Sequence, residues 1–219
     1  MNDITAKFFQ AYWQPGMMEV YTEDVSAAMM AGPVNEDGWF EWKLAEGTLL
    51  DAEYERLAKA HGVLLPPSFI DWHKAFFFCD GDCFIARLPP SLPNEPLRHL
   101  AAELKTGEYL DLTTQGLYTF AQANNDAGPL VFDARQPVEN NEFPIREYEH
   151  DAGNYSGDLA GLSEVIFSSF SKMLECLTFF LNRPKAMDQT EAVRAFFTID
   201  PTGAGGPGRE YWLSQFVEH

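Results

Sequence analysis

The chain has 219 residues, of which 46% are hydrophobic and 14% aromatic, so a disordered chain is excluded and a buried core is expected. Fifteen basic against 33 acidic residues give a net charge of −18, which excludes the basic face that nucleic-acid binding needs and disfavours anionic membranes. The same charge favours a basic protein partner, although solubility alone explains it equally well.

The compartment is predicted from three further features. Asp3 stands where a secretory signal peptide needs basic residues, and the apolar runs are shorter than the roughly 20 residues of a membrane span. Three cysteines are an odd number, which is not typical of a secreted disulfide framework. We therefore expect a cytoplasmic protein with free thiols and no membrane contact.

The first elements along the chain are predicted to be helical. Residues 1–38 form a helical lead-in that contains a second short helix at 25–31, and a short aromatic stretch follows at 39–42. The next helix begins at Thr48, which we expect to be its N-cap, and ends at Gly62. A further helix is expected over residues 69–76.

The middle of the chain alternates strand patterns with turns. Cys79–Asp–Gly–Asp–Cys83 is typical of a turn, because Asp-Gly tolerates positive φ. A helix over 97–105 is expected to stop at Gly107. Strands are predicted over residues 84–88, 109–112, 117–122, 130–134, 143–150 and 163–167.

The last third of the chain is predicted to be helical again. Residues 169–181 carry apolar side chains at helical spacing, Asp188 with Glu191 forms a capping pattern, and a short helix surrounds Trp212. Helices, then strands, then helices predict an α+β fold with an antiparallel sheet rather than repeated βαβ units.

The glycine-rich stretch 203–208 matches G-x-G-x-x-G literally. A dinucleotide site needs this motif between a strand and a helix, with a later strand and an acidic residue about 20 positions on. The chain has only eleven residues after Gly208. We therefore expect a flexible loop and no nucleotide cofactor.

A zinc site is also not expected. Cys79 and Cys83 follow His73, but no second Cys or His pair lies nearby, and a structural zinc needs four ligands. The two cysteines are interpreted as small thiols on either side of a turn, and the chain is predicted to hold neither metal nor cofactor.

A hydrolase remains the enzymatic alternative. On one strand face, Glu147 and Glu149 would lie about 7 Å apart, which is within the range of an inverting glycosidase pair, and His150 follows them. Adjacent acids at a strand end more often form a solvated edge, so we expect no catalytic residues here.

Four segments, in their order and spacing, resemble the SUKH superfamily, which includes fungal cell-wall assembly regulators and many bacterial immunity proteins. They are a helix at 49–61 followed by Gly62–Val–Leu–Leu–Pro66, a strand at 128–133 ending in Asp, a strand at 144–151 with His-Asp, and a Ser-Phe helix at 166–177. The resemblance covers about residues 39–181. Asp80–Gly81–Asp82 replaces the Asn-Gly-Gly turn that is usual in the family.

The resemblance implies a central, mainly antiparallel sheet with helices packed on one side, and no catalytic residues. It implies a non-enzymatic immunity protein that neutralises a cognate toxin, nucleases being one such class; a regulatory scaffold is the alternative. We expect a helical extension at 1–38, the SUKH-like domain at 39–184, and a C-terminal helical extension at 185–219 packed on that domain.

The partner-binding surface is predicted to be an acidic face that carries exposed aromatic residues. The candidates are Trp39, Trp42, Asp80, Asp82, Glu147, Glu149 and Asp151. The competing interpretation is that the tryptophans belong to the core and the acids only solubilise the chain.

Overall fold

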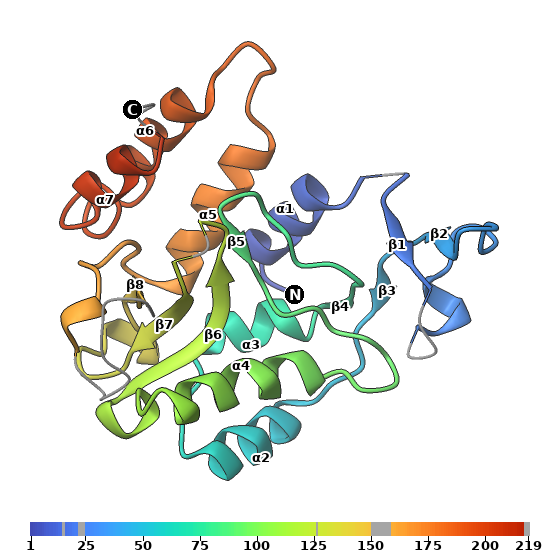
Figure 1. The fold of residues 1–219 in the computed structure, drawn as a ribbon, viewed down its shortest axis with the longest axis horizontal. Coiled ribbons are helices and arrows are strands. Elements are labelled where there is room, and N and C mark those ends of the chain that lie inside the picture. The colour runs from blue at the N-terminus through green and yellow to red at the C-terminus, as the bar shows by residue number, and fades with distance from the viewer. Residues whose placement is uncertain (15, 22–24, 126, 150–158, 217–219) are drawn as a thin grey trace.

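The centre of the computed structural model is a four-stranded antiparallel sheet in the order β5–β6–β7–β8, with two separate two-stranded sheets, β1–β2 and β3–β4 (Figure 1). The structure describes residues 1–14, 16–21, 25–125, 127–149 and 159–216. The strands are β1 (Met18–Val20), β2 (Trp39–Glu41), β3 (Ala45–Glu46), β4 (Phe76–Phe77), β5 (Ala86–Arg87), β6 (Leu117–Ala123), β7 (Pro129–Asp133) and β8 (Ile145–Glu147).

Helices surround the central sheet, which confirms the α+β class. The α-helices are α1 (Asp3–Tyr12), α2 (Asp51–His61), α3 (Pro67–His73), α4 (Arg98–Tyr109), α5 (Phe170–Leu181), α6 (Gln189–Ile199) and α7 (Arg209–Ser214). The short 3-10 turns are η1 (Ala27–Met29), η2 (Thr113–Gln115), η3 (Glu139–Asn141) and η4 (Leu159–Gly161).

Helix α5 lies where its apolar stripe predicts. The Ser169 hydroxyl caps it by accepting the backbone N–H of Lys172 at 3.2 Å. The stripe is buried, and the Phe170 ring packs edge-on against Phe120 and Phe132, which stack on each other on neighbouring strands. The helix therefore covers one face of the sheet.

Helix α4 adds cover on the opposite face of the same sheet. Thr119 pairs in register with Val131, so it alternates with the positions that face Phe132. Its hydroxyl donates to the carbonyl of Glu103 and accepts the N–H of Gly107, both in α4. Helix α4 therefore adds to the helices that pack against the antiparallel sheet.

One continuous core joins the chain from end to end. Phe8 in α1, Phe170 in α5 and Trp212 in α7 belong to the same cluster of buried residues. Residues of both predicted extensions thus contribute to the core of the central domain.

Several predicted element boundaries are wrong in the first half of the chain. The helix expected over 25–31 is only the 3-10 turn η1, and the one expected over 69–76 is α3, which begins earlier and ends at His73. Thr48 lies outside α2, where the carboxylate of Glu53 instead accepts the Leu50 N–H at 2.9 Å.

Two predicted strands are also wrong, and two are shorter than predicted. Residues 109–112 continue from α4, because Gly107 does not end the helix but allows close contact with the Thr119 side chain. Residues 84–88 form only the two-residue strand β5, and residues 163–167 form bridges such as Ile145–Phe167 instead of a strand. The strand predicted over 143–150 is β8, only three residues long.

The glycine-rich stretch 203–208 is a set of packed turns rather than a flexible loop. Both oxygens of the buried Asp200 carboxylate accept hydrogen bonds, from Ser168 and from the N–H groups of Gly203 and Ala204. A Cβ at Gly203 would overlap the backbone of Ser168, and one at Gly205 the backbone of Phe197. Close backbone packing is therefore why this segment needs glycine.

Candidate partner-binding surface

The loop at residues 79–84 is held in one conformation by its own acids and by the core below it. Asp80 Oδ1 accepts the Asp82 N–H at 3.0 Å, and the Tyr12 hydroxyl donates to the carbonyl of Asp80. Gly81 is buried, and a Cβ there would overlap the carbonyl of Leu88. The loop thus packs tightly at its tip and keeps the Asp82 carboxylate exposed.

Phe84 is the most unusual residue of this loop. It has φ of 67°, a left-handed conformation that is costly for an aromatic residue, and its side chain is 63% exposed. Asp82 Oδ1 fixes it by accepting the Phe84 N–H at 2.9 Å and the Asn124 side-chain N–H at 2.7 Å. An apolar ring is therefore held in solvent beside Asp82, and its other neighbours are the Phe180 ring, 6.2 Å away between centroids, and the Arg183 guanidinium, 5.9 Å from the ring centroid.

Two adjacent asparagines connect this loop to the end of β8. Asn124 bonds to Asp82, and Asn125 donates to Glu147 Oε2 at 2.9 Å. A pocket of about 160 Å³ lies between the loop and α7. It is lined by Phe84, Ile85, Asn124, Asn125, Tyr211, Trp212, Gln215 and Phe216. The structure therefore brings the predicted residues Asp82 and Glu147 to one corner of the molecule.

Glu147 itself is buried and does not belong to the exposed surface. Its Oε2 also accepts a hydrogen bond from the Tyr211 hydroxyl at 2.6 Å. Burial and the nearby Glu147 charge together raise the pKa of Tyr211. Glu149 is exposed and follows the end of β8, where its N–H donates to Gly161. The two glutamates are therefore not a pair on one strand face, and His150 and Asp151 lie outside the described residues.

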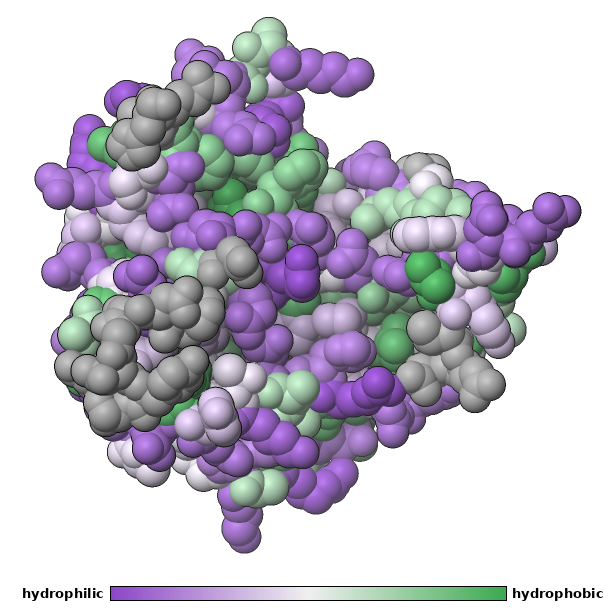
Figure 2. All heavy atoms as spheres, viewed as in Figure 1, coloured by the Kyte–Doolittle hydropathy of each residue, from purple (hydrophilic) through white to green (hydrophobic). Residues whose placement is uncertain are grey.

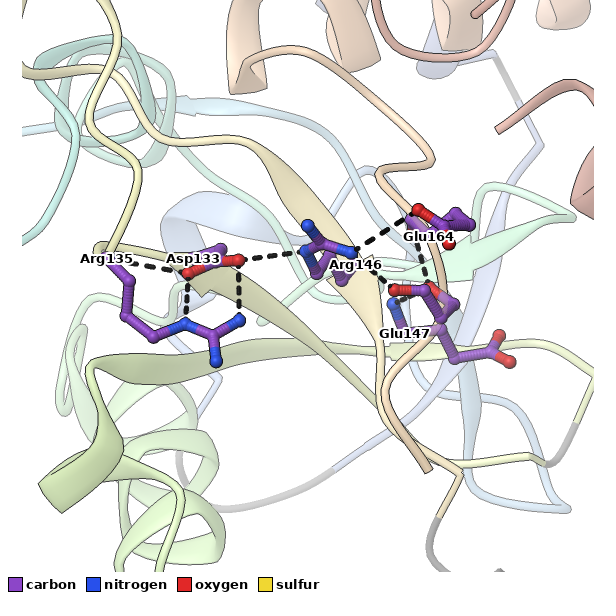
Figure 3. Close-up of polar contacts among 6 residues, drawn as sticks. Asp133, Arg135, Arg146, Glu147 and Glu164 are labelled. Atoms are coloured by element: carbon purple, nitrogen blue, oxygen red, sulfur yellow. Dashed lines mark hydrogen bonds and ion pairs between the residues drawn. The ribbon is translucent and has the colours of Figure 1, made fainter. Parts of the chain in front are cut away.

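A cluster of ion pairs lies beside Glu147, where Asp133 ends β7 and Arg146 lies in β8 (Figure 3). The fully buried Asp133 accepts hydrogen bonds from Arg135 at 2.7 and 2.8 Å and from Arg146 at 2.8 Å. Arg146 also donates to the Ser163 carbonyl and lies 4.0 Å from Glu164. The arginine charges are thus used within the fold, and the cluster stabilises the sheet.

The two candidate tryptophans lie in different environments. Trp42 is fully buried, so the prediction that it lies on an exposed face is wrong; its side chain packs in the core. Trp39 is 42% exposed on the β1–β2 hairpin, which projects from the molecule away from β8 (Figure 1). The seven candidates therefore do not form a single surface.

His73 and Cys83 are buried, and Cys79 is half-buried. His73 Nδ1 lies 2.7 Å from the Tyr54 hydroxyl, and burial lowers the pKa of His73 to about 3, so the ring is neutral. Burial raises the pKa of Cys79 to about 12 and that of Cys83 well above its usual value, and both thiols are free. Within the described ranges, no three His, Cys, Asp or Glu side chains are grouped to hold a metal ion.

Comparisons of the chain with protein-family models, curated proteins and solved structures find no match. The resemblance to the SUKH superfamily therefore stays a prediction. In the part of the chain that the structure describes, no helix has the length and apolar character needed to cross a bilayer.

Phe84 was missed by the sequence reasoning, which placed it inside a strand. The signal that could have found it is the Asp-x-Phe spacing after Gly81, since an Asp side chain commonly accepts the N–H two residues on and tolerates a turn there. The hydrophobic pattern did not indicate that Phe84 is exposed, because a phenylalanine in an apolar run is normally assigned to the interior.

Proposed function

We propose that this chain is a protein-binding domain that neutralises a basic toxin domain by covering it, as an immunity protein does. Phe84 carries the proposal: it is an exposed aromatic side chain whose backbone is fixed by Asp82, in a chain of net charge −18. Rigid aromatic anchors lose little entropy on binding and dominate the affinity of many interfaces.

The acids around the anchor have a different role from the ring. Asp82 is exposed next to it, Asp80 is half-buried in the same loop, and Glu149 is exposed after the end of β8. Exposed charges of this kind mainly attract a basic partner and set the association rate, while the buried contact sets the lifetime of the complex. The resemblance to immunity proteins adds the biological role, and basic nucleases are a class of toxin that fits this charge.

The experiment first asks whether the gene next to the one for this chain encodes a toxin domain, and then mixes that purified domain with the chain. We expect a 1:1 complex that inhibits the toxin, with an association rate that falls as salt is raised. Phe84→Ala should weaken binding by about tenfold or more, mainly through faster dissociation.

Tyr109→Ala is the matched control, because Tyr109 is also an exposed aromatic residue, 81% exposed at the end of α4. It should leave binding unchanged. Lack of any complex with the neighbouring toxin domain would overturn the proposed function, and equal losses in both variants would remove Phe84 from the interface.

A further inference from the structure

The β1–β2 hairpin presents an apolar outer face to solvent. Phe40 is fully buried and pairs in register with Glu19, so these two residues define the inner face. Met18, Val20 and Trp39 alternate with them on the outer face and are 46%, 41% and 42% exposed. Hydrophobic side chains are visible on this projection in Figure 2.

The outer-face side chains are close neighbours. The Tyr21 N–H donates to the Gly38 carbonyl, and the Trp42 N–H donates to the Met17 carbonyl. Between these two bonds, the β1–β2 residue pairs alternate between pairs joined by backbone hydrogen bonds and pairs without them. Val20 and Trp39 are a pair without direct backbone bonds, the kind in which side chains approach most closely. Together with Met18 they form a continuous apolar strip.

Strand β1 is the edge of this small sheet. On the far side of β2, Ala31 donates to the Glu41 carbonyl and Asn35 to the Trp39 carbonyl. Within the described chain, β1 pairs with β2 alone. The outward N–H of Val20 donates at 2.8 Å to the carboxylate of Glu19 rather than to another strand.

The rim of the strip is acidic. The described part of residues 17–46 contains one lysine and five carboxylates, which are Glu19, Glu36, Asp37, Glu41 and Glu46. Glu41 is on the outer face itself, where its carboxylate accepts the Gly16 N–H at 2.8 Å, and Glu36 and Asp37 are exposed near the turn. This charge selects the occupant, because a second copy of the chain would bring like charges together.

We propose that the strip formed by Met18, Val20 and Trp39 binds an extended, basic segment of a partner protein. An apolar side chain of that segment lies on Val20 and Trp39, and its Lys or Arg residues pair with the rim carboxylates. Its backbone extends the sheet along β1 and replaces the Glu19 carboxylate at the Val20 N–H. The inference rests on the proposed function only for the basic nature of the partner.

The test is selection of linear peptides of about twelve residues from a random displayed library on the whole protein. We expect enriched peptides to carry several Lys or Arg residues around a large apolar residue. Trp39→Ala should weaken a selected peptide by about tenfold, whereas Phe84→Ala should have no effect. Hydrogen exchange should slow at Val20 when the peptide is bound.

The outcomes separate this inference from the proposed function. Failure to enrich basic peptides, or equal binding to the Trp39→Ala variant, would overturn the docking strip even if the toxin domain binds through Phe84. Selected basic peptides that depend on Trp39, with no binding of the toxin domain, would support the strip and reject the immunity role.

Discussion

At the scale of single residues, Asp133 is a fully buried carboxylate whose charge is compensated by two arginines. Burial alone would raise the pKa of its carboxyl, but the hydrogen bonds and charges of Arg135 and Arg146 outweigh burial and lower it. Arg146 has a side chain that is 13% exposed, so it too is charged in a largely dry site. Removing one partner of such a group leaves an uncompensated buried charge.

Replacing Asp133→Asn should therefore lower the free energy of unfolding by about 3 kcal/mol at neutral pH, because Arg146 loses its counter-ion. The folded-state pKa of Asp133 is lowered, so its contribution is complete above the unfolded value of about 3.9 and is lost as the pH falls through the folded value. Urea unfolding of both proteins across acidic pH measures this.

The difference between the two proteins should be constant from neutral pH to about pH 5 and shrink below about pH 4. Asp71→Asn is the control, because Asp71 pairs with Lys74 at a more exposed site and should change stability little. A difference that grows on acidification would contradict the assigned direction.

At the scale of elements, the C-terminal turns are an example of an element organised by one side chain. Asp200 ends α6 and binds backbone N–H groups of two segments, the one before α5 and the one at 203–204. Trp212 then closes the packing by donating to the Ile166 carbonyl at 2.9 Å. Helix α7 is therefore attached through the hydrogen bonds of Asp200 and Trp212, and the close backbone packing around them requires glycine at position 203.

Gly203→Ala should destabilise the protein by about 1–3 kcal/mol, since the new methyl group would meet the backbone of Ser168 and the carboxylate of Asp200. Thermal or urea unfolding measures the change. Gly32→Ala is the matched control, because nothing lies within 4 Å of its added Cβ. Equal stability of both variants would show that the turns are not packed as described.

The long helices and inner strands were predictable because a single periodicity decides them. Helix α5 carries its whole stripe in sequence, and β6 and β7 are apolar runs with turns at their ends. The bounds of the short strands β5 and β8 were not predictable, because these strands are defined by pairing with distant residues, which no local sequence pattern reveals. Gly107 was misjudged because the same residue either ends a helix or permits close packing.

The candidate surface was predictable only in part, for a related reason. The exposure of Asp82 follows from the composition of its turn, but the burial of Glu147 against Tyr211 of α7 depends on a residue that is distant in sequence. Trp39 and Trp42 are only three positions apart, yet Trp39 lies on the outer face of β2 and Trp42 lies in the core.

At the scale of the whole molecule, the surface carries a large net negative charge. The chain has 18 more carboxylates than basic side chains, and most ion pairs in the described residues lie on the surface, such as Lys7 with Asp3. Self-repulsion of such a surface opposes the compact state and is screened by salt. Surface pairs weaken in salt too, but each contributes little.

The melting temperature should therefore rise when sodium chloride is increased from low to moderate concentration. Differential scanning calorimetry measures this, and choline chloride at the same ionic strength is the control for specific sodium binding. A melting temperature that falls over this range would mean that attractive pairs outweigh the net repulsion.

The exposure of Trp39 gives the molecule an optical reporter. Trp42, Trp72 and Trp212 are buried and Trp13 is half-buried, so Trp39 is the indole that soluble quenchers reach first. We expect its emission to be that of a hydrated ring, and covering the β1–β2 strands should shift this emission to the blue without disturbing the buried rings. A single Trp39→Phe variant isolates its spectrum by subtraction, so occupancy of the hairpin can be read in solution without any attached label.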